Sequence, residues 1–183
     1  MTNTWTIDPT TGPNSWYVND TSVAGDMFCT ATGSDSNNGF EPDEPVRALA
    51  LVLARVSTGD TVYIDDGIYY GHWQIDTPYV TVIGADSTAT MLVCESGFNG
   101  LALNNCTGAV LRNFRIQDAS GANYGIILSG SPQAWLDGIN ASGNAQGGIR
   151  LQSGSPGVEI SNCEALYNSG GAGISVNSSD TVS

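Results

Sequence analysis

Three arginines in the second half of the chain have the chemistry to hold carboxylate groups: Arg112, Arg115 and Arg150. Their neighbours belong to alternating apolar runs that point inward, so each guanidinium is expected to face outward. There it can bind a carboxylate through two parallel hydrogen bonds. The same arginines also fit ordinary surface ion pairs with nearby carboxylates. The sequence contains no lysine that could serve as a base for removing a proton from a carbon acid.

Two carboxylates and one indole are also expected to face outward and are further candidate ligand residues. Asp137 and Glu159 are placed on adjacent turns of the chain, and paired carboxylates can act as acid and base on a glycosidic bond. Any acidic repeat produces such neighbours, so a solvated surface explains them equally. Trp135 has inward-pointing neighbours on both sides, so its ring is expected to face outward, where it can stack on a sugar or lie under a loop.

The loop around Asp35 offers oxygen ligands for a cation. Asp35 and Asn37 present oxygens at alternate positions, and Glu41 and Asp43 add two carboxylates, which is the ligand chemistry that calcium prefers. The distal bidentate glutamate of an EF-hand is absent. Calcium is therefore the one cofactor that this sequence suggests, and an Asx-turn loop without metal is the alternative.

The remaining reactive side chains are one histidine and four cysteines. His72 sits among aromatic residues and fits either an acid or base for epimerisation or a surface histidine. The cysteines lack the close spacing of zinc sites. They are expected to be small buried hydrophobic residues, with one disulfide of unknown pairing as the alternative. They are Cys29, Cys94, Cys106 and Cys163.

A repeat of about two dozen residues must position these side chains. Its units start at Gly100, Gly125, Gly148 and Gly173, spaced 25, 23 and 25 residues apart. Each unit contains three short runs in which apolar and polar residues alternate, the pattern of strands with one buried face. The first inward column contains Leu101, Leu103, Ile126, Leu128, Ile149, Leu151, Ile174 and Val176. Three strands per unit predict one coil of a parallel β-helix, and antiparallel hairpins are the alternative.

One corner of the predicted coil has its own signal. The inward spacing jumps from two to three at Asn113, Gly138 and Asn162, and these residue types tolerate a left-handed backbone. A sharp bend there would turn the strand through a corner without a loop. Stacked asparagine side chains at this position are also expected to hydrogen-bond along the axis.

The front of the chain predicts a capping helix over residues 44–57. Leu49, Val52, Leu53 and Val56 form one apolar face, and Pro45 suits the first turn. A helix with such a face can cover the open end of a solenoid, or it can pack on the side. The expected organisation is an N-terminal tail over residues 1–15 and a β-helix domain over residues 16–183, as the N-terminal part of a longer chain.

The same N-terminal region carries a family resemblance. The segments that carry it are Trp16–Asp20, Gly33–Pro42, Pro45–Leu49, Gly59–Ile64 and Asp66–Tyr69. Together they resemble the amino-terminal signature of right-handed parallel β-helix proteins, the pectate lyase and chondroitinase-like superfamily. The resemblance implies an all-β fold, a right-handed parallel β-helix with one N-terminal capping α-helix. Many members are secreted or cell-surface proteins that cleave, epimerise or bind acidic polysaccharides, and others have no known chemistry.

Charge and composition narrow the function classes. The net charge is −13 with no lysine, so a basic footprint for nucleic acid or for anionic membranes is missing. No apolar stretch is long enough for membrane insertion. No secretory signal is visible at Met1–Trp5, although the acidic composition suits an extracellular or cell-surface location.

These observations favour an extracellular β-solenoid module that is non-catalytic by itself and presents a carbohydrate-binding or scaffold surface, with polysaccharide as its partner. A polysaccharide lyase or uronate epimerase fragment that acts on acidic polysaccharide is the first alternative. The second is a self-assembling structural protein whose open C-terminal end stacks on a neighbour, or on further coils.

Overall fold

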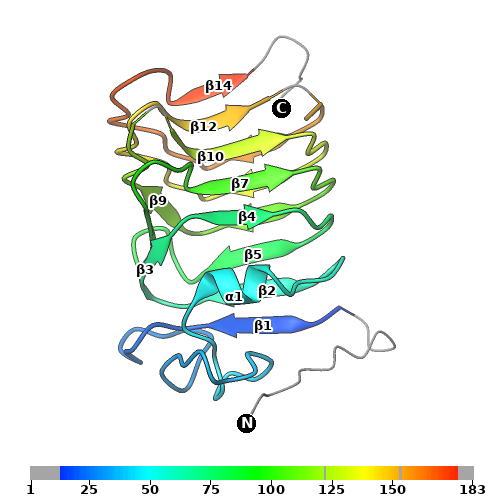
Figure 1. Ribbon diagram of the computed structural model, residues 1–183, viewed down its shortest axis with the longest axis vertical. Helices are drawn as coiled ribbons and strands as arrows, with labels where there is room; N and C mark the ends of the chain where they lie inside the picture. Colours follow the sequence, from blue (N-terminus) through cyan, green and yellow to red (C-terminus); the bar gives the residue numbers. More distant parts are fainter. Residues whose placement is uncertain (1–12, 122, 153, 177–183) are drawn as a thin grey trace.

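The computed structural model describes residues 13–121, 123–152 and 154–176. Three parallel sheets run along one axis and enclose a single core (Figure 1). Strand pairs join residues about one coil apart in the sequence, and every ladder among the described strands is parallel. The predicted all-β parallel β-helix is confirmed, and the hairpin alternative is wrong.

The three sheets differ in length. The six-stranded sheet has the order β1 (Ser15–Val18), β2 (Thr61–Ile64), β5 (Thr81–Gly84), β8 (Val110–Arg112), β11 (Trp135–Asp137) and β13 (Glu159–Ser161). The five-stranded sheet has the order β14 (Ile174–Val176), β12 (Gly147–Leu151), β10 (Tyr124–Ser129), β7 (Leu101–Asn104) and β4 (Trp73–Ile75). The three-stranded sheet has the order β3 (Gly67–Gly71), β6 (Thr90–Cys94) and β9 (Arg115–Gln117).

The register matches the repeat that the sequence predicts. Ile126 pairs with Leu101 on one side and with Ile149 on the other, and Ile149 pairs in turn with Ile174. The inner members of this column are buried, because a coil lies above and below each of them. In the last described coil, Ile174 and Val176 remain 39% and 43% exposed. The apolar column thus builds the core and leaves an apolar rim at its C-terminal end.

The predicted corner is confirmed by its backbone. Asn113, Gly138 and Asn162 have φ values of 57°, 64° and 51°, all in the left-handed region. A Cβ at Gly138 would lie 2.7 Å from Oδ1 of Asn113, so the residue stacked on that asparagine must be small. At this corner Nδ2 of Asn162 donates to Oδ1 of Asp137 and not to a stacked asparagine.

The extended asparagine ladder occurs at a different corner. The amide of Ala119 donates to Oδ1 of Asn144, and the amide of Asn144 donates in the same way to Oδ1 of Asn168. A serine ladder marks another corner, where Ser131 accepts from the amide of Cys106 and donates to the carbonyl of Leu103. These buried side chains supply the hydrogen bonds that the backbone at a corner needs.

The helix α1 (Leu49–Leu53) is shorter than the predicted range of 44–57. Val46 instead forms a parallel bridge with Val18, which holds the chain extended just before the helix. Leu49, Val52, Leu53 and Val56 are buried, as the apolar face predicts. In Figure 1, α1 lies below β4 and above β1, and the helix contacts both strands. It therefore lies at the N-terminal end of the five-stranded sheet, as a cap would.

The buried carboxylate of Asp60 holds the N-terminal segment against the first coil through hydrogen bonds. Asp60 accepts hydrogen bonds from the amide of Asn14, from Nε1 of Trp16 and from the amide of Ser57. The first strand thus begins at Ser15. Most of the predicted tail, residues 1–12, lies outside the described residues.

All four cysteines are free thiols, so the disulfide alternative is not realised. Cys29, Cys94 and Cys106 are buried, as expected for small hydrophobic residues, and Cys163 is half-buried. Burial raises the pKa of Cys94 to about 12 and that of Cys106 to about 11. These thiols therefore stay protonated near neutral pH and are poor nucleophiles.

Candidate functional site

The three arginines predicted to bind ligand lie on three different sheets. Arg112 is on β8 of the six-stranded sheet, Arg115 is on β9 of the three-stranded sheet, and Arg150 is on β12 of the five-stranded sheet. All three are outward-facing, as predicted, but the faces of a β-helix point in different directions. These arginines therefore do not form one shared carboxylate site.

Arg115 and Arg150 contact different residues from those around Arg112. Nη1 of Arg150 donates to the hydroxyl of Tyr124 at 2.7 Å, and its guanidinium carbon lies 5.1 Å from the centroid of the same ring. Arg115 forms a parallel bridge with Asn140 on the next coil. Neither arginine lies beside the indole or the carboxylates of the predicted wall.

Arg112 does lie in a cluster with the predicted tryptophan. Its guanidinium carbon is 5.0 Å from the centroid of the Trp135 ring, and Nη2 lies 3.1 Å from Oδ2 of Asp137. Nε1 of Trp135 donates to Oγ of Ser161 at 3.1 Å. We call Arg112, Trp135, Asp137, Ser161 and Asn162 the Trp135 cluster. It spans three neighbouring strands of the six-stranded sheet, β8, β11 and β13.

Asp137 holds the Trp135 cluster together. Its Oδ1 accepts from Nδ2 of Asn162 at 2.8 Å and from Oγ of Ser161 at 2.9 Å. These two bonds, and then the guanidinium of Arg112, hold the pKa of Asp137 below its ordinary value, because each stabilises the charged form. The carboxylate thus remains charged in mildly acidic solution, and its bonding fixes the rotamers of its neighbours.

Trp135 is half-buried, with the guanidinium of Arg112 over one face of its ring. The predicted outward direction is confirmed, but the ring is less open than a free tryptophan on a flat wall. Glu159 is exposed and pairs directly with Trp135 in the strand register. The structure therefore brings together four of the predicted ligand residues: Arg112, Trp135, Asp137 and Glu159.

In the loop predicted to bind calcium, the side chains of Asp35 and Asn37 already form hydrogen bonds or an ion pair within the protein. Oδ1 of Asp35 accepts from the amide of Ala48, and Oδ2 forms an ion pair with Arg47 at 3.2 Å. The side-chain amide of Asn37 donates to the carbonyl of Pro45. Across residues 13–121, 123–152 and 154–176, no three His, Cys, Asp or Glu side chains gather closely enough to hold a metal. Glu41 and Asp43 thus do not join Asp35 in a carboxylate cluster.

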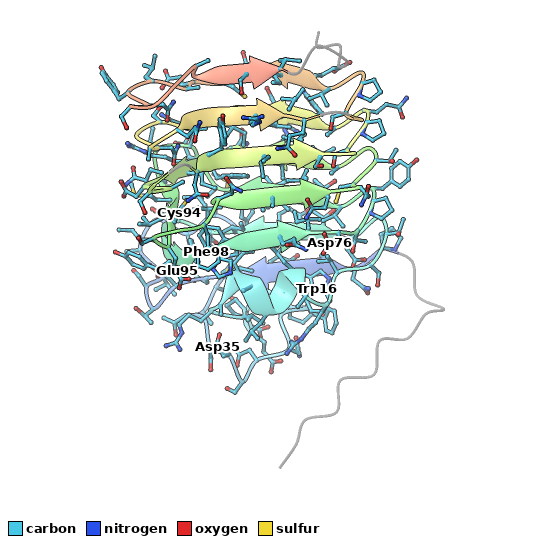
Figure 2. The ribbon with its side chains drawn as sticks, turned by 45° about the horizontal axis from the view of Figure 1, so that its top comes forward. Trp16, Asp35, Asp76, Cys94, Glu95 and Phe98 are labelled. Atoms are coloured by element: carbon cyan, nitrogen blue, oxygen red, sulfur yellow. The ribbon has the colours of Figure 1, made fainter. Side chains whose placement is uncertain are left out.

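A hollow of about 490 Å³ lies between α1 and the strands β3 and β4. His72 borders it, with Nδ1 2.9 Å from Oε2 of Glu95 and its ring stacked on Phe98 at 4.1 Å. Figure 2 shows Glu95 and Phe98 at one edge of the coil and Asp76 toward the opposite edge. The sequence singles out His72 but not its two partners, which lie one coil further along the chain.

Comparison with protein families places the chain in a known class. The family model described as "Right handed beta helix region" matches residues 63–183. The chain therefore belongs to the right-handed β-helix family, as its resemblance implies. A comparison with curated proteins finds no match.

Solved structures that share the fold include "Pectin methylesterase PemA from Erwinia chrysanthemi". The TM-score is 0.53 at 11% sequence identity, and the match covers 84% of this chain and 55% of the esterase chain. This likeness concerns the fold alone. Within the part of the chain that the structure describes, no helix is both long and apolar enough to cross a membrane.

Proposed function

We propose that this chain is a carbohydrate-binding β-helix module, non-catalytic by itself, which acts outside the cell or at the cell surface. The observation that carries the proposal is the Trp135 cluster. A half-buried indole lies beside a guanidinium and a charged carboxylate on the outward face of the six-stranded sheet. Aromatic rings with fixed polar neighbours suit sugars, which present apolar ring faces and hydroxyl edges.

The bonding of Asp137 supports the non-catalytic part of the proposal. A general base works best when its pKa lies near the working pH. The carboxylate of Asp137 is held by Ser161 and Asn162 on Oδ1 and by Arg112 on Oδ2, and these partners lower its pKa further from neutrality, which makes it a weaker base. This geometry suits a platform that keeps its shape better than a group that changes its protonation state.

Replacing Trp135 with alanine is expected to weaken binding of an acidic oligosaccharide by about tenfold or more, because the stacking surface is lost. Calorimetric titration with hexamers from pectate, alginate and chondroitin measures the affinity. Each titration is run with and without calcium, because a cation can bridge sugar carboxylates to a chain of charge −13. Tyr167→Ala is the matched control, because Tyr167 is a 90% exposed aromatic residue outside the cluster.

Two outcomes would contradict the binding proposal: no hexamer binds the unmodified chain, or Trp135→Ala binds as well as Tyr167→Ala. The same mixtures are followed for unsaturated sugar products. Product formation would overturn the non-catalytic part and favour the alternative, a polysaccharide lyase or epimerase fragment. That alternative is supported by the shared fold only.

A second candidate function, self-assembly through the C-terminal end, is favoured by the apolar rim there. Ile174, Val176 and Leu166 are all exposed on the last described coil. Buried counterparts of Ile174 and Val176 form the core one coil below, so a second copy stacked on this rim would extend the same apolar column. Light scattering over a hundredfold range of concentration is expected to show a mass above the 19.0 kDa of one chain. A constant monomer mass would rule this function out.

A further inference from the structure

Two adjacent hollows lie along α1, and none of the residues of the Trp135 cluster lines either of them. The hollow of about 490 Å³ beside β3 is followed by a second one of about 480 Å³ beside β4. The two hollows share Ala50, His72 and Trp73 as lining residues. We call them together the α1 groove. Each has the volume of a small-molecule site, and both together fit an extended ligand.

The α1 groove has a fixed floor and an exposed aromatic rim. Tyr69 and Trp73 line it and are buried, so their packing keeps the floor of the groove in one shape. Tyr70 lies on the rim and is 75% exposed. The stacking on Phe98 and the contact with Glu95 hold the ring of His72 in place. An open tyrosine ring above a rigid aromatic floor is a surface on which a sugar ring can stack.

The charges of the α1 groove select against acidic ligands. Asp20, Asp35 and Glu95 line the first hollow, and Asp76 lines the second. Arg47 is the arginine of the first hollow, and it is already paired with Asp35. The chain as a whole carries −13, which adds to the repulsion of a polyanion.

The same carboxylates are good acceptors for hydroxyl groups. Glu95 is more than half exposed, and its Oε2 is oriented by His72. Asp76 accepts from Gln74 and from Asn104, which fixes its carboxylate at the far end of the groove. Hydrogen bonds from sugar hydroxyls to such carboxylates are charge-assisted and therefore stronger than neutral ones.

We propose that the α1 groove binds a neutral glycan, a run of uncharged sugar rings that stack on Tyr70 and donate hydroxyl hydrogen bonds to Glu95 and Asp76. The site is separate from the Trp135 cluster, which lies on the six-stranded sheet. The inference therefore stands or falls independently of the function proposed for that cluster.

The test is a calorimetric titration of the unmodified chain with cellohexaose, xylohexaose and mannohexaose, and with hexagalacturonate as the charged comparison. At least one neutral hexamer is expected to bind, and Tyr70→Ala is expected to weaken that binding by about tenfold or more. Glu95→Gln is expected to weaken it as well, because the charge-assisted bonds become neutral ones. Tyr167→Ala is expected to leave it unchanged, because Tyr167 lies outside the α1 groove.

The variants are chosen so that folding does not confuse the result. Tyr70 and Glu95 are both exposed, and circular dichroism of each variant checks that the fold is kept. The proposal is overturned if no neutral hexamer binds at millimolar concentration. It is equally overturned if Tyr70→Ala and Glu95→Gln both leave binding unchanged, or if hexagalacturonate binds more tightly and Tyr70→Ala abolishes that binding.

Discussion

Replacing Asp65 with asparagine is expected to lower the free energy of unfolding by about 3 kcal/mol. Backbone N–H groups that now donate to a carboxylate oxygen would then face the amide nitrogen of asparagine, which cannot accept a hydrogen bond. Asp65 is fully buried. Its two oxygens accept from the amides of Met27, Phe28 and Cys29 at 2.6, 2.7 and 2.6 Å. One side chain therefore holds the N-terminal loop against the end of β2.

The matched control for Asp65→Asn is Asp43→Asn, because Asp43 is an exposed aspartate in the same N-terminal region. Urea unfolding of both variants measures the difference, and limited proteolysis reports whether the loop around Met27 becomes accessible. Equal stability of the two variants would contradict the role assigned to Asp65. So would a destabilised Asp65→Asn whose N-terminal loop remains as resistant to protease as before.

Replacing Ile149 with alanine is expected to cost about 2–5 kcal/mol of stability, because it opens a cavity in a column packed from both sides. Ile149 pairs with Ile126 below and with Ile174 above, and it is fully buried. Ile174 occupies the same column one coil later and is 39% exposed. Ile174→Ala is therefore expected to cost less than about 1 kcal/mol in the monomer.

This pair compares the same substitution at two heights of one stack. Urea unfolding at low protein concentration gives both values. Equally large losses of stability at the two positions would show that something covers the C-terminal rim, which is the outcome that self-assembly predicts at high concentration. Equally small losses of stability would show that the column through Ile149 is not the core.

Most of the fold could be predicted from the sequence because the coil repeats. A strand that alternates inward and outward residues gives the buried face, and the repeat length gives the register that stacks Leu128 under Leu151. The corner at Asn113 follows from its residue type and the change in spacing. Local pattern and repeat length thus point to the same architecture, which is why the prediction is accurate.

Other features depend on contacts that the repeat does not encode. The helix begins at Leu49 and not at Glu44 because Val46 pairs with Val18, a contact between segments that have no repeat relation. The asparagine ladder runs through Asn144 and Asn168, and nothing in the sequence favours that corner over the one at Asn113.

The candidate sites were only partly predictable for the same reason. Alternation shows that Arg112 and Arg115 face outward, but the bend at Asn113 between them turns them onto different sheets. That bend was visible in the sequence, and it was the signal that separates the two arginines. The sequence does not link Glu95 and Phe98 to His72, because the early coils repeat less clearly than the later ones and no column of the repeat contains all three.

Every site described above depends on residues about two dozen apart lying directly above one another. Methyl-to-methyl nuclear Overhauser effects in protein labelled at Ile, Leu and Val methyl groups test this most directly. We expect cross-peaks between Leu103 and Leu128 and between Leu128 and Leu151, the pairs in register, with none between Leu103 and Leu151. Missing cross-peaks for the adjacent pairs, together with the close Hα–Hα contacts of antiparallel hairpins, would contradict the account.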